Sequence, residues 1–149
     1  MVVAGVAPFQ HFFREGANLD VDKADLKRYQ AFVRDKIADL LTIAEARANA
    51  DDRDVIESRD LPITKGLQES IHRFRKLDVG AEVRPMLEEI ATRPQLDLAV
   101  ASDVDELLPE VAGGLSLALG QTFGLIDSNV RNPATEHWER AFRVFDLLL

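Results

Sequence analysis

The chain has 149 residues, of which 46% are hydrophobic, contains no cysteine and carries a formal net charge of −8. This length and apolar content favour one compact unit with a substantial core, and the absence of cysteine excludes disulfides and thiol chemistry. Because no apolar run approaches the roughly 18 residues of a membrane span and no basic residue precedes the short N-terminal apolar run, we predict a cytoplasmic protein without membrane contact.

The first elements in chain order are a short helix and a much longer one. Residues 8–15 predict the short helix, with Pro8 in its first turn and Gly16 at its C-terminal cap. Asp22 is suited to cap a helix over residues 23–50, because apolar side chains recur there at steps of three and four residues. These apolar side chains occupy more than one side of the helix, so we expect it to have several neighbours.

A loop and a third helix complete this half of the chain. The helical period stops after the long helix, and Val55–Ile56 is expected to be a short extended segment between charged residues. We predict a third helix over residues 60–76, capped by Asp60. Pro62 then falls in the first turn, where its missing N–H costs nothing, and Gly66 indicates the close approach of another backbone.

The same order of elements repeats in the second half. Residues 82–91 predict a short helix, and residues 102–126 predict a long apolar one. Pro109 lies inside the long helix, and because proline costs about 3 kcal/mol in a helix interior, we expect a kink or a break there. A second extended loop is expected at residues 129–132, followed by a last helix over residues 133–148.

The two halves are expected to pack against each other, since only residues 78–81 separate them. A unit of three helices leaves the flanks of its long helix uncovered, and each large apolar side chain left in water forgoes about 1.5–3 kcal/mol. The second half is the nearest cover. Gly113, Gly114 and Gly120 would let a crossing helix approach closely, so we predict one compact unit over residues 1–149.

Short, long and third helices joined by two loops are also the plan of the histone fold, and two features resemble archaeal histones. Residues 6–17 resemble their first helix and its exit. Arg53, seven positions before Asp60, is similar to the loop arginine and helix-start aspartate that form a structural ion pair in that family. The resemblance implies a loop-fixing ion pair here, which we expect to matter more for stability than for binding.

Longer sequence segments resemble those of a small bacterial family of unknown function in which one chain contains two histone folds. The similarity is carried by residues 18–28, 60–69 and 132–140 and extends over nearly the whole chain. It implies an all-α fold with two histone folds, over residues 5–77 and 78–149, packed as an intramolecular pseudodimer. Since that family has no settled role, the resemblance implies a fold and no activity.

Most of the residues that contact DNA in archaeal histones are replaced by other residue types at the corresponding positions of this chain. Their loop arginine is followed by Lys-Thr, whose positions hold Asp54 and Val55 here, so an anion and an apolar group replace a cation and a hydroxyl. The arginine of their first helix falls at His11, which is mostly neutral at pH 7. In the second half, Val130 and His137 stand where the arginine and aspartate of the ion pair would be, so the pair is expected only once.

Charge is distributed unevenly between the halves. Residues 1–77 contain 13 basic and 13 acidic residues, whereas residues 78–149 contain 5 basic and 13 acidic residues. The candidate DNA-binding residues, interleaved with acids, are Lys23, Lys27, Arg28, Arg53, Lys65 and Arg131. A solvated helix surface with weak ion pairs is the simpler interpretation, and any DNA binding should be weak and steeply salt-dependent.

The sequence contains no recognisable catalytic constellation. The histidines, His11, His72 and His137, lack metal-ligand spacing, and the acidic run at residues 51–54 lacks the glycine and distant glutamate of a calcium loop. A nucleophile elbow and a glycine-rich phosphate loop are also missing from the sequence. We therefore predict no enzyme activity, cofactor, metal or small-molecule substrate.

Two functions fit these observations. We favour a non-enzymatic binding module that associates with a protein partner or with itself, because the reversed loop charges and the acidic half disfavour wrapped DNA. The alternative is a nucleoid-associated DNA-binding protein that uses the basic residues of the first half together with Arg131. Trp138 is expected to anchor the core, but an exposed Trp138 beside the acidic half would instead mark a partner site.

Overall fold

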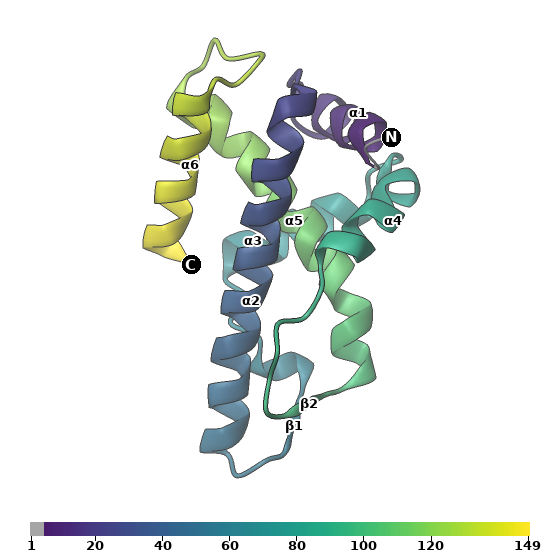
Figure 1. Ribbon diagram of the computed structural model, residues 1–149, viewed down its shortest axis with the longest axis vertical. Coiled ribbons are helices and arrows are strands. Elements are labelled where there is room, and N and C mark those ends of the chain that lie inside the picture. The colour runs from purple at the N-terminus through teal and green to yellow at the C-terminus, as the bar shows by residue number, and fades with distance from the viewer. Residues whose placement is uncertain (1–4) are drawn as a thin grey trace.

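The computed structural model describes residues 5–149, which consist mainly of helices (Figure 1). This content confirms the predicted all-α class. The six α-helices of the described residues are α1 (Val6–Ala17), α2 (Leu26–Ala50), α3 (Lys65–Arg75), α4 (Gly80–Ile90), α5 (Ser102–Ile126) and α6 (Thr135–Leu148). Two-residue strands β1 (Val55–Ile56) and β2 (Ala99–Val100) and 3₁₀ turns at Lys23–Asp25 and Ser58–Asp60 lie in the connections. Within residues 5–149, none of the helices has the length and apolar content needed to cross a membrane.

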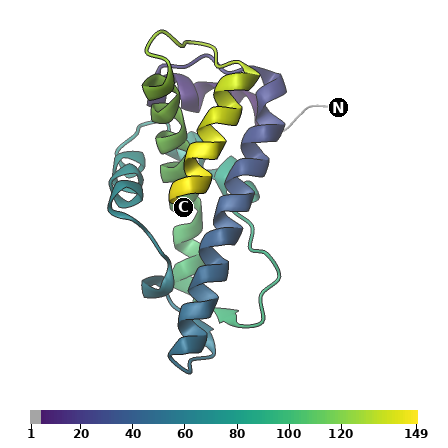
Figure 2. The same cartoon turned by 90° about the vertical axis from the view of Figure 1, so that its left-hand side faces the viewer.

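One long helix from each half occupies the centre of the molecule. α2 and α5 run past each other at an angle, and α1 and α4 lie together near one end (Figure 1). In Figure 2, α6 lies in front of α5, with α3 on one side and α2 on the other. A buried contact joins the long helices, since the Tyr29 hydroxyl donates to Ser116 Oγ (2.7 Å), which donates to the carbonyl oxygen of Ala112 (2.7 Å). Burial raises the pKa of Tyr29, so its hydroxyl stays protonated.

The connecting loops join the two halves at both ends of the long helices. At one end β1 pairs with β2 in parallel register, and the carboxylate of Glu45 accepts the backbone N–H groups of residues 97–98 just before β2. At the other end the backbone N–H of Asp20 donates to the carbonyl oxygen of Arg131 (2.6 Å). The predicted extended segment at Val55–Ile56 is therefore confirmed, and residues 129–132 lie, as predicted, in a loop between two helices.

Glycines in α5 allow close packing by helices of the first half, as predicted. A Cβ atom on Gly113 would lie 2.5 Å from the Phe74 ring of α3, and one on Gly114 would lie 2.8 Å from the backbone nitrogen of Ile71. A Cβ atom on Gly120 would lie 2.6 Å from a side chain of α1. Because real Cβ contacts are longer than these distances, only glycine permits the observed helix separation.

The third helix begins later than predicted. Asp60 ends a 3₁₀ turn, and α3 starts after Thr64, whose Oγ1 accepts the backbone N–H of Leu67 (3.2 Å). Pro62 therefore precedes the helix and does not occupy its first turn. Among the described residues no atom lies within 4 Å of a Cβ placed on Gly66, so the predicted close backbone contact there is wrong.

The other helix boundaries also differ in detail from the predictions. α5 runs through Pro109 without interruption, so of the predicted kink or break the break is wrong; thirteen of its 25 residues are buried, and their burial outweighs the local cost of about 3 kcal/mol for the proline. α4 begins two residues earlier than predicted, which places Pro85 beyond its first turn. α1 includes Gly16 and ends at Ala17; the residue that caps it is Asn18, which adopts the left-handed conformation (φ 54°) in place of the predicted glycine.

Candidate interaction surfaces

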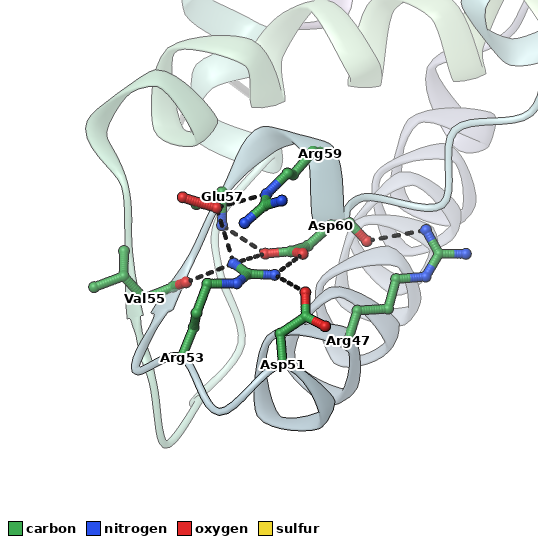
Figure 3. Close-up of polar contacts among 7 residues, drawn as sticks. All are labelled: Arg47, Asp51, Arg53, Val55, Glu57, Arg59 and Asp60. Carbon is green, nitrogen blue, oxygen red and sulfur yellow. Dashed lines mark hydrogen bonds and ion pairs between the residues drawn. The ribbon is translucent and has the colours of Figure 1, made fainter.

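Arg53 and Asp60 contact each other directly in the loop between α2 and α3 (Figure 3). Both terminal nitrogens of the Arg53 guanidinium donate to the carboxylate of Asp60, Nη1 to Oδ2 at 2.8 Å. The same guanidinium also donates to carboxylate oxygens of Glu57 and Asp51, each at 3.0 Å. Asp60 in turn accepts the backbone N–H of Glu57 (2.8 Å). A bidentate pair with these additional bonds fixes the conformation of the loop.

The electrostatics of this pair disfavour a role for Arg53 in binding phosphate. The Asp60 side chain is only 4% exposed, and its hydrogen bonds from Arg53 lower its pKa to about 2. The hydrogen bond to Asp60 raises the pKa of Arg53. The guanidinium is therefore surrounded by three carboxylates, which cancel most of the positive field that a phosphate group would meet.

The loop between α5 and α6 is fixed by a different pair, which sequence reasoning did not identify. His137 Nδ1 accepts the backbone N–H of Ala134 (3.0 Å), and His137 Nε2 donates to Asp127 Oδ2 (3.1 Å). This network assigns the single proton of the neutral imidazole to Nε2. The backbone N–H of Asn129, together with His137, lowers the pKa of Asp127. The second loop thus replaces an arginine–aspartate pair with an aspartate–histidine pair.

The six candidate DNA-binding residues do not form one surface. They are spread along and beyond α2, which is about 37 Å long at 1.5 Å per residue. Lys23, Lys27 and Arg28 lie at the start of α2, near the loop that carries Arg131, and Arg53 follows its end. Lys65 begins α3, next to Thr64, which lines a hollow together with Lys36 and Ile43 from the middle of α2. Such a separation leaves no continuous basic face that combines all six side chains.

Acidic neighbours neutralise most of these cations. Arg28 lies 3.5 Å from Asp25, Lys65 lies 2.9 Å from Glu69, and the side chain of Arg131 lies 3.8 Å from Asp20. Burial raises the pKa of Asp25. Within residues 5–149, only Lys23 and Lys27 of the six have no carboxylate within 4.0 Å.

Trp138 is completely buried and packs edge-on against Phe123, with their ring centroids 4.8 Å apart. The guanidinium carbon of Arg28 lies 5.9 Å from the centre of the Trp138 ring. The prediction that Trp138 anchors the core is therefore confirmed. The alternative, a partner site at Trp138, is wrong, because a side chain without exposed area cannot contact a partner.

The histidine and carboxylate side chains of residues 5–149 form no group of three or more that could hold a metal ion. His11 Nδ1 lies 2.8 Å from Glu82 Oε2 and so connects α1 with α4, while His137 contacts Asp127. His72 lies apart from both, in a polar hollow beside α3. Each of these two histidines therefore joins two segments of the chain: His11 joins α1 to α4, and His137 joins α6 to the end of α5.

A groove between α3, α5 and α6 is a mainly apolar concave surface. It has a volume of about 420 Å³, and none of its twelve lining residues has an ionisable side chain. Leu67 of α3, Ala118 of α5 and Phe145 of α6 are among the residues that line it. The three helices lie beside one another in Figure 2, so the groove follows the junction between the two halves of the chain.

Exposed apolar side chains cluster around this groove. Of the six large ones exposed in residues 5–149, Leu125, Val144 and Leu148 line the groove, and Leu147 is the neighbour of Leu148 in the last turn of α6. Ile43 lines a smaller hollow of about 170 Å³ that shares three lining residues with the groove. Leu125, Leu147 and Leu148 are 81%, 85% and 74% exposed. Single exposed leucines are ordinary, but such a cluster marks an interaction surface.

The last turn of α6 is held firmly at the edge of this surface. Lys36, buried on α2, contacts the carboxylate of Asp146 and lies 3.7 Å from that of Asp39. The ring of Phe142 stacks on that of Phe32, with centroids 4.9 Å apart. The exposed leucines therefore project from a fixed helix.

Comparison with known proteins places the chain in a family. A family model described as "Domain of unknown function (DUF1931)" matches residues 9–146. The chain belongs to this family. An uncharacterized protein from Aquifex aeolicus (strain VF5) is 29% identical over 142 residues, which cover 95% of this chain and 82% of that protein.

Two crystal structures resemble this DUF1931 protein over nearly its whole length. A Thermus thermophilus protein is 51% identical, with a TM-score of 0.87 and coverage of 97% of both chains. An Aquifex aeolicus protein, solved at 1.9 Å, is 28% identical, with a TM-score of 0.83 and coverage of 97% of this chain and 95% of that one. The family description names no activity, so the function has to be argued from the surfaces of the molecule.

Sequence reasoning missed the apolar groove of this DUF1931 protein. It expected Trp138 to anchor the core, and Trp138 and Phe145 belong to the buried inner stripe of α6. The sequence contained a signal for an outer apolar surface, because Val144, Leu147 and Leu148 lie beside that inner stripe on the same helix and widen it. When a helix carries more apolar residues than its buried face can hold, the other apolar residues stay exposed and can contact another surface.

Proposed function

We propose that this protein is a non-enzymatic binding module, built from two histone folds in one chain, that associates with protein through the groove between α3, α5 and α6. The observation that carries the proposal is the cluster of exposed apolar side chains around that groove. An apolar concave surface with protruding leucines excludes water best when another protein covers it.

The reciprocal packing of the halves supports the two histone folds, over residues 5–77 and 78–149. Each half has a short helix, a 25-residue helix and a third helix in the same order. The second loop of the first half, at β1, pairs with the first loop of the second half, at β2. Conversely, the first loop of the first half, at Asp20, bonds to the second loop of the second half, at Arg131. α3 also packs on the long helix of the other half.

The charges of the candidate DNA contacts favour protein over DNA as the partner. Arg53 and Lys65 are paired with acids, and the second half contributes the whole net charge of −8. One observation supports the alternative of DNA binding: Lys23 and Lys27 lie near Arg131, at one end of the molecule. Two or three cations can hold a phosphate backbone only weakly.

A gel-shift titration with a DNA duplex separates these two functions. We expect no saturable shift at about 0.15 M salt, and at low salt a weak shift that Lys23→Gln with Lys27→Gln abolishes, because few phosphates can be neutralised. Lys65→Gln, which removes a cation already paired with Glu69, is the matched control and should leave the low-salt shift unchanged. Saturable binding at physiological salt would overturn the preference for protein.

A photo-crosslinking amino acid tests protein association at the groove directly. Placed at position 147 and activated in living cells, it should form covalent adducts with protein, because Leu147 projects from the groove edge. The same amino acid at position 95, an exposed site in the loop before β2, should form few. Equal adduct yields at both positions would refute association through this surface.

A further inference from the structure

We infer that a second hollow, beside α3, binds an acidic segment of another protein. The hollow has a volume of about 730 Å³ and is lined by residues of α3, of the loop before it and of the first turns of α5. It shares no lining residue with the groove between α3, α5 and α6. The two surfaces can therefore be tested separately.

The lining of this hollow is positive in an acidic protein. Lys65, Arg73 and Arg75 contribute three positive charges and Glu69 contributes one negative charge, so the lining carries +2, compared with −8 for the whole chain. The row of cations follows α3 for about 15 Å at 1.5 Å per residue. An anionic ligand therefore meets an attractive field here and a repulsive one over much of the remaining surface.

Arg73 is the cation of this lining that is most available to a ligand. Within residues 5–149 it has no carboxylate within 4.0 Å, and its Nη1 donates to the neutral Oε1 of Gln121 (3.1 Å). The other two cations of the lining each contact a carboxylate already. The bond to Gln121 orients the guanidinium without cancelling its charge, so Arg73 can donate two parallel hydrogen bonds to a carboxylate of a ligand.

The dipole of α3 does not account for the whole row of cations. Basic side chains are favourable in the last turn of a helix, which explains His72, Arg73 and Arg75. Lys65, however, is the first residue of α3, where the same dipole disfavours a cation. The row therefore extends beyond what the stability of the helix requires.

The floor of the hollow favours a protein segment over nucleic acid. Ile71 is buried and Ile63 and Leu107 are half-buried, so apolar side chains form the floor, whereas the exposed charged side chains form the rim. None of the described lining residues is aromatic, so a base has no ring to stack on, and phosphate groups use charge and hydrogen bonds instead of apolar contact. A segment that carries both carboxylates and apolar side chains fits rim and floor together.

The site is also preformed. A Cβ atom on Gly114 of α5 would lie 2.8 Å from the backbone nitrogen of Ile71, so α3 rests directly on α5 and holds the floor in place. Little conformational entropy of the helix is lost when a ligand covers the hollow.

Fluorescence anisotropy of two labelled peptides, titrated with the full chain at about 0.15 M salt, tests this site. The peptides share the same leucines and glycines and differ only in carrying glutamate or glutamine at the remaining positions. We expect the glutamate peptide to bind with a Kd below about 1 mM and at least about tenfold more tightly than the glutamine peptide. The net charge of −8 alone would produce the opposite order, so this preference identifies a local basic site.

Three variants locate the binding at the hollow. Arg73→Gln should weaken binding of the glutamate peptide about tenfold. Arg143→Gln is the matched control, because Arg143 is exposed on α6, outside the hollow, and within residues 5–149 it too has no carboxylate within 4.0 Å. This control should bind as the wild type does. Glu69→Gln, which removes the acid from the lining, should tighten binding, a gain that loss of folding cannot produce.

Equal affinity for the two peptides would overturn the inference, as would an Arg73→Gln variant that binds the glutamate peptide as tightly as the wild type does. Both results would leave the proposed association at the groove standing, because the two surfaces share no lining residue. A DNA duplex that binds at the same salt and is lost in Arg73→Gln, while neither peptide binds, would overturn the inference in favour of nucleic acid.

Discussion

Gly114→Ala is expected to lower the free energy of unfolding by about 2 kcal/mol, although alanine is the better helix former. The added Cβ would lie 2.8 Å from the backbone nitrogen and 3.0 Å from the Cα of Ile71. Backbone atoms cannot rotate away, so α3 as a whole would have to move off α5. Urea denaturation followed by circular dichroism measures the change. Because α3 forms one wall of the groove, the same displacement should also weaken protein association there.

Gly124→Ala is the matched control, in the same helix and with the same change of side chain. Among the described residues no atom lies within 4 Å of a Cβ placed there, so the substitution should gain about 0.5–1 kcal/mol from helix propensity. If Gly114→Ala lowers the free energy of unfolding and Gly124→Ala raises it, then the contact between α3 and α5, and not the conformational freedom of glycine, decides the effect of the substitution. Equal stabilisation by both substitutions would contradict the close packing of α3 on α5.

The helix order could be predicted from the sequence, because apolar periodicity reports which residues face inward. The start of α3 could not be predicted in the same way. Aspartate is a residue type that often caps helices, but the carboxylate of Asp60 accepts hydrogen bonds from Arg53 and from the backbone N–H of Glu57. Thr64 caps the helix instead. β2 escaped prediction because two residues, Ala99 and Val100, carry too little pattern and become a strand only by pairing with β1.

The candidate sites also differ in whether the sequence alone could predict them. The contact of Arg53 with Asp60 could be anticipated, since both partners lie in one loop, seven residues apart. The groove depends on which neighbours cover a helix: Phe123 is fully buried, whereas Leu125, two residues later, is exposed because none of the helices in residues 5–149 covers that side of α5. Exposure of this kind is a property of the assembled fold. It cannot be read from the apolar character of either residue alone.

Arg53→Ala is expected to lower the melting temperature by about 4–8 °C at pH 7 and to leave DNA binding and protein association at the groove unchanged. The physical reason is the carboxylate of Asp60, which would remain buried without its partner. In the folded protein the pKa of Asp60 is about 2, compared with 3.8 for an unperturbed aspartate, a difference worth about 2 kcal/mol of stability at neutral pH. Differential scanning calorimetry provides the measurement.

The pH dependence of that loss tests its origin. A carboxylate whose pKa is lowered by folding stabilises the protein above its unfolded pKa, and this contribution disappears as the pH falls through the folded value. The stability that Asp60 contributes to the wild type should therefore be full above pH 3.8 and shrink as the pH approaches 2, and the loss caused by Arg53→Ala should shrink with it. Arg59→Ala is the matched control, since Arg59 lies in the same loop and its one ion pair within residues 5–149 is with the exposed carboxylate of Glu57. A loss from Arg59→Ala as large as that from Arg53→Ala would mean that general loop charge, not the buried pair, stabilises this segment.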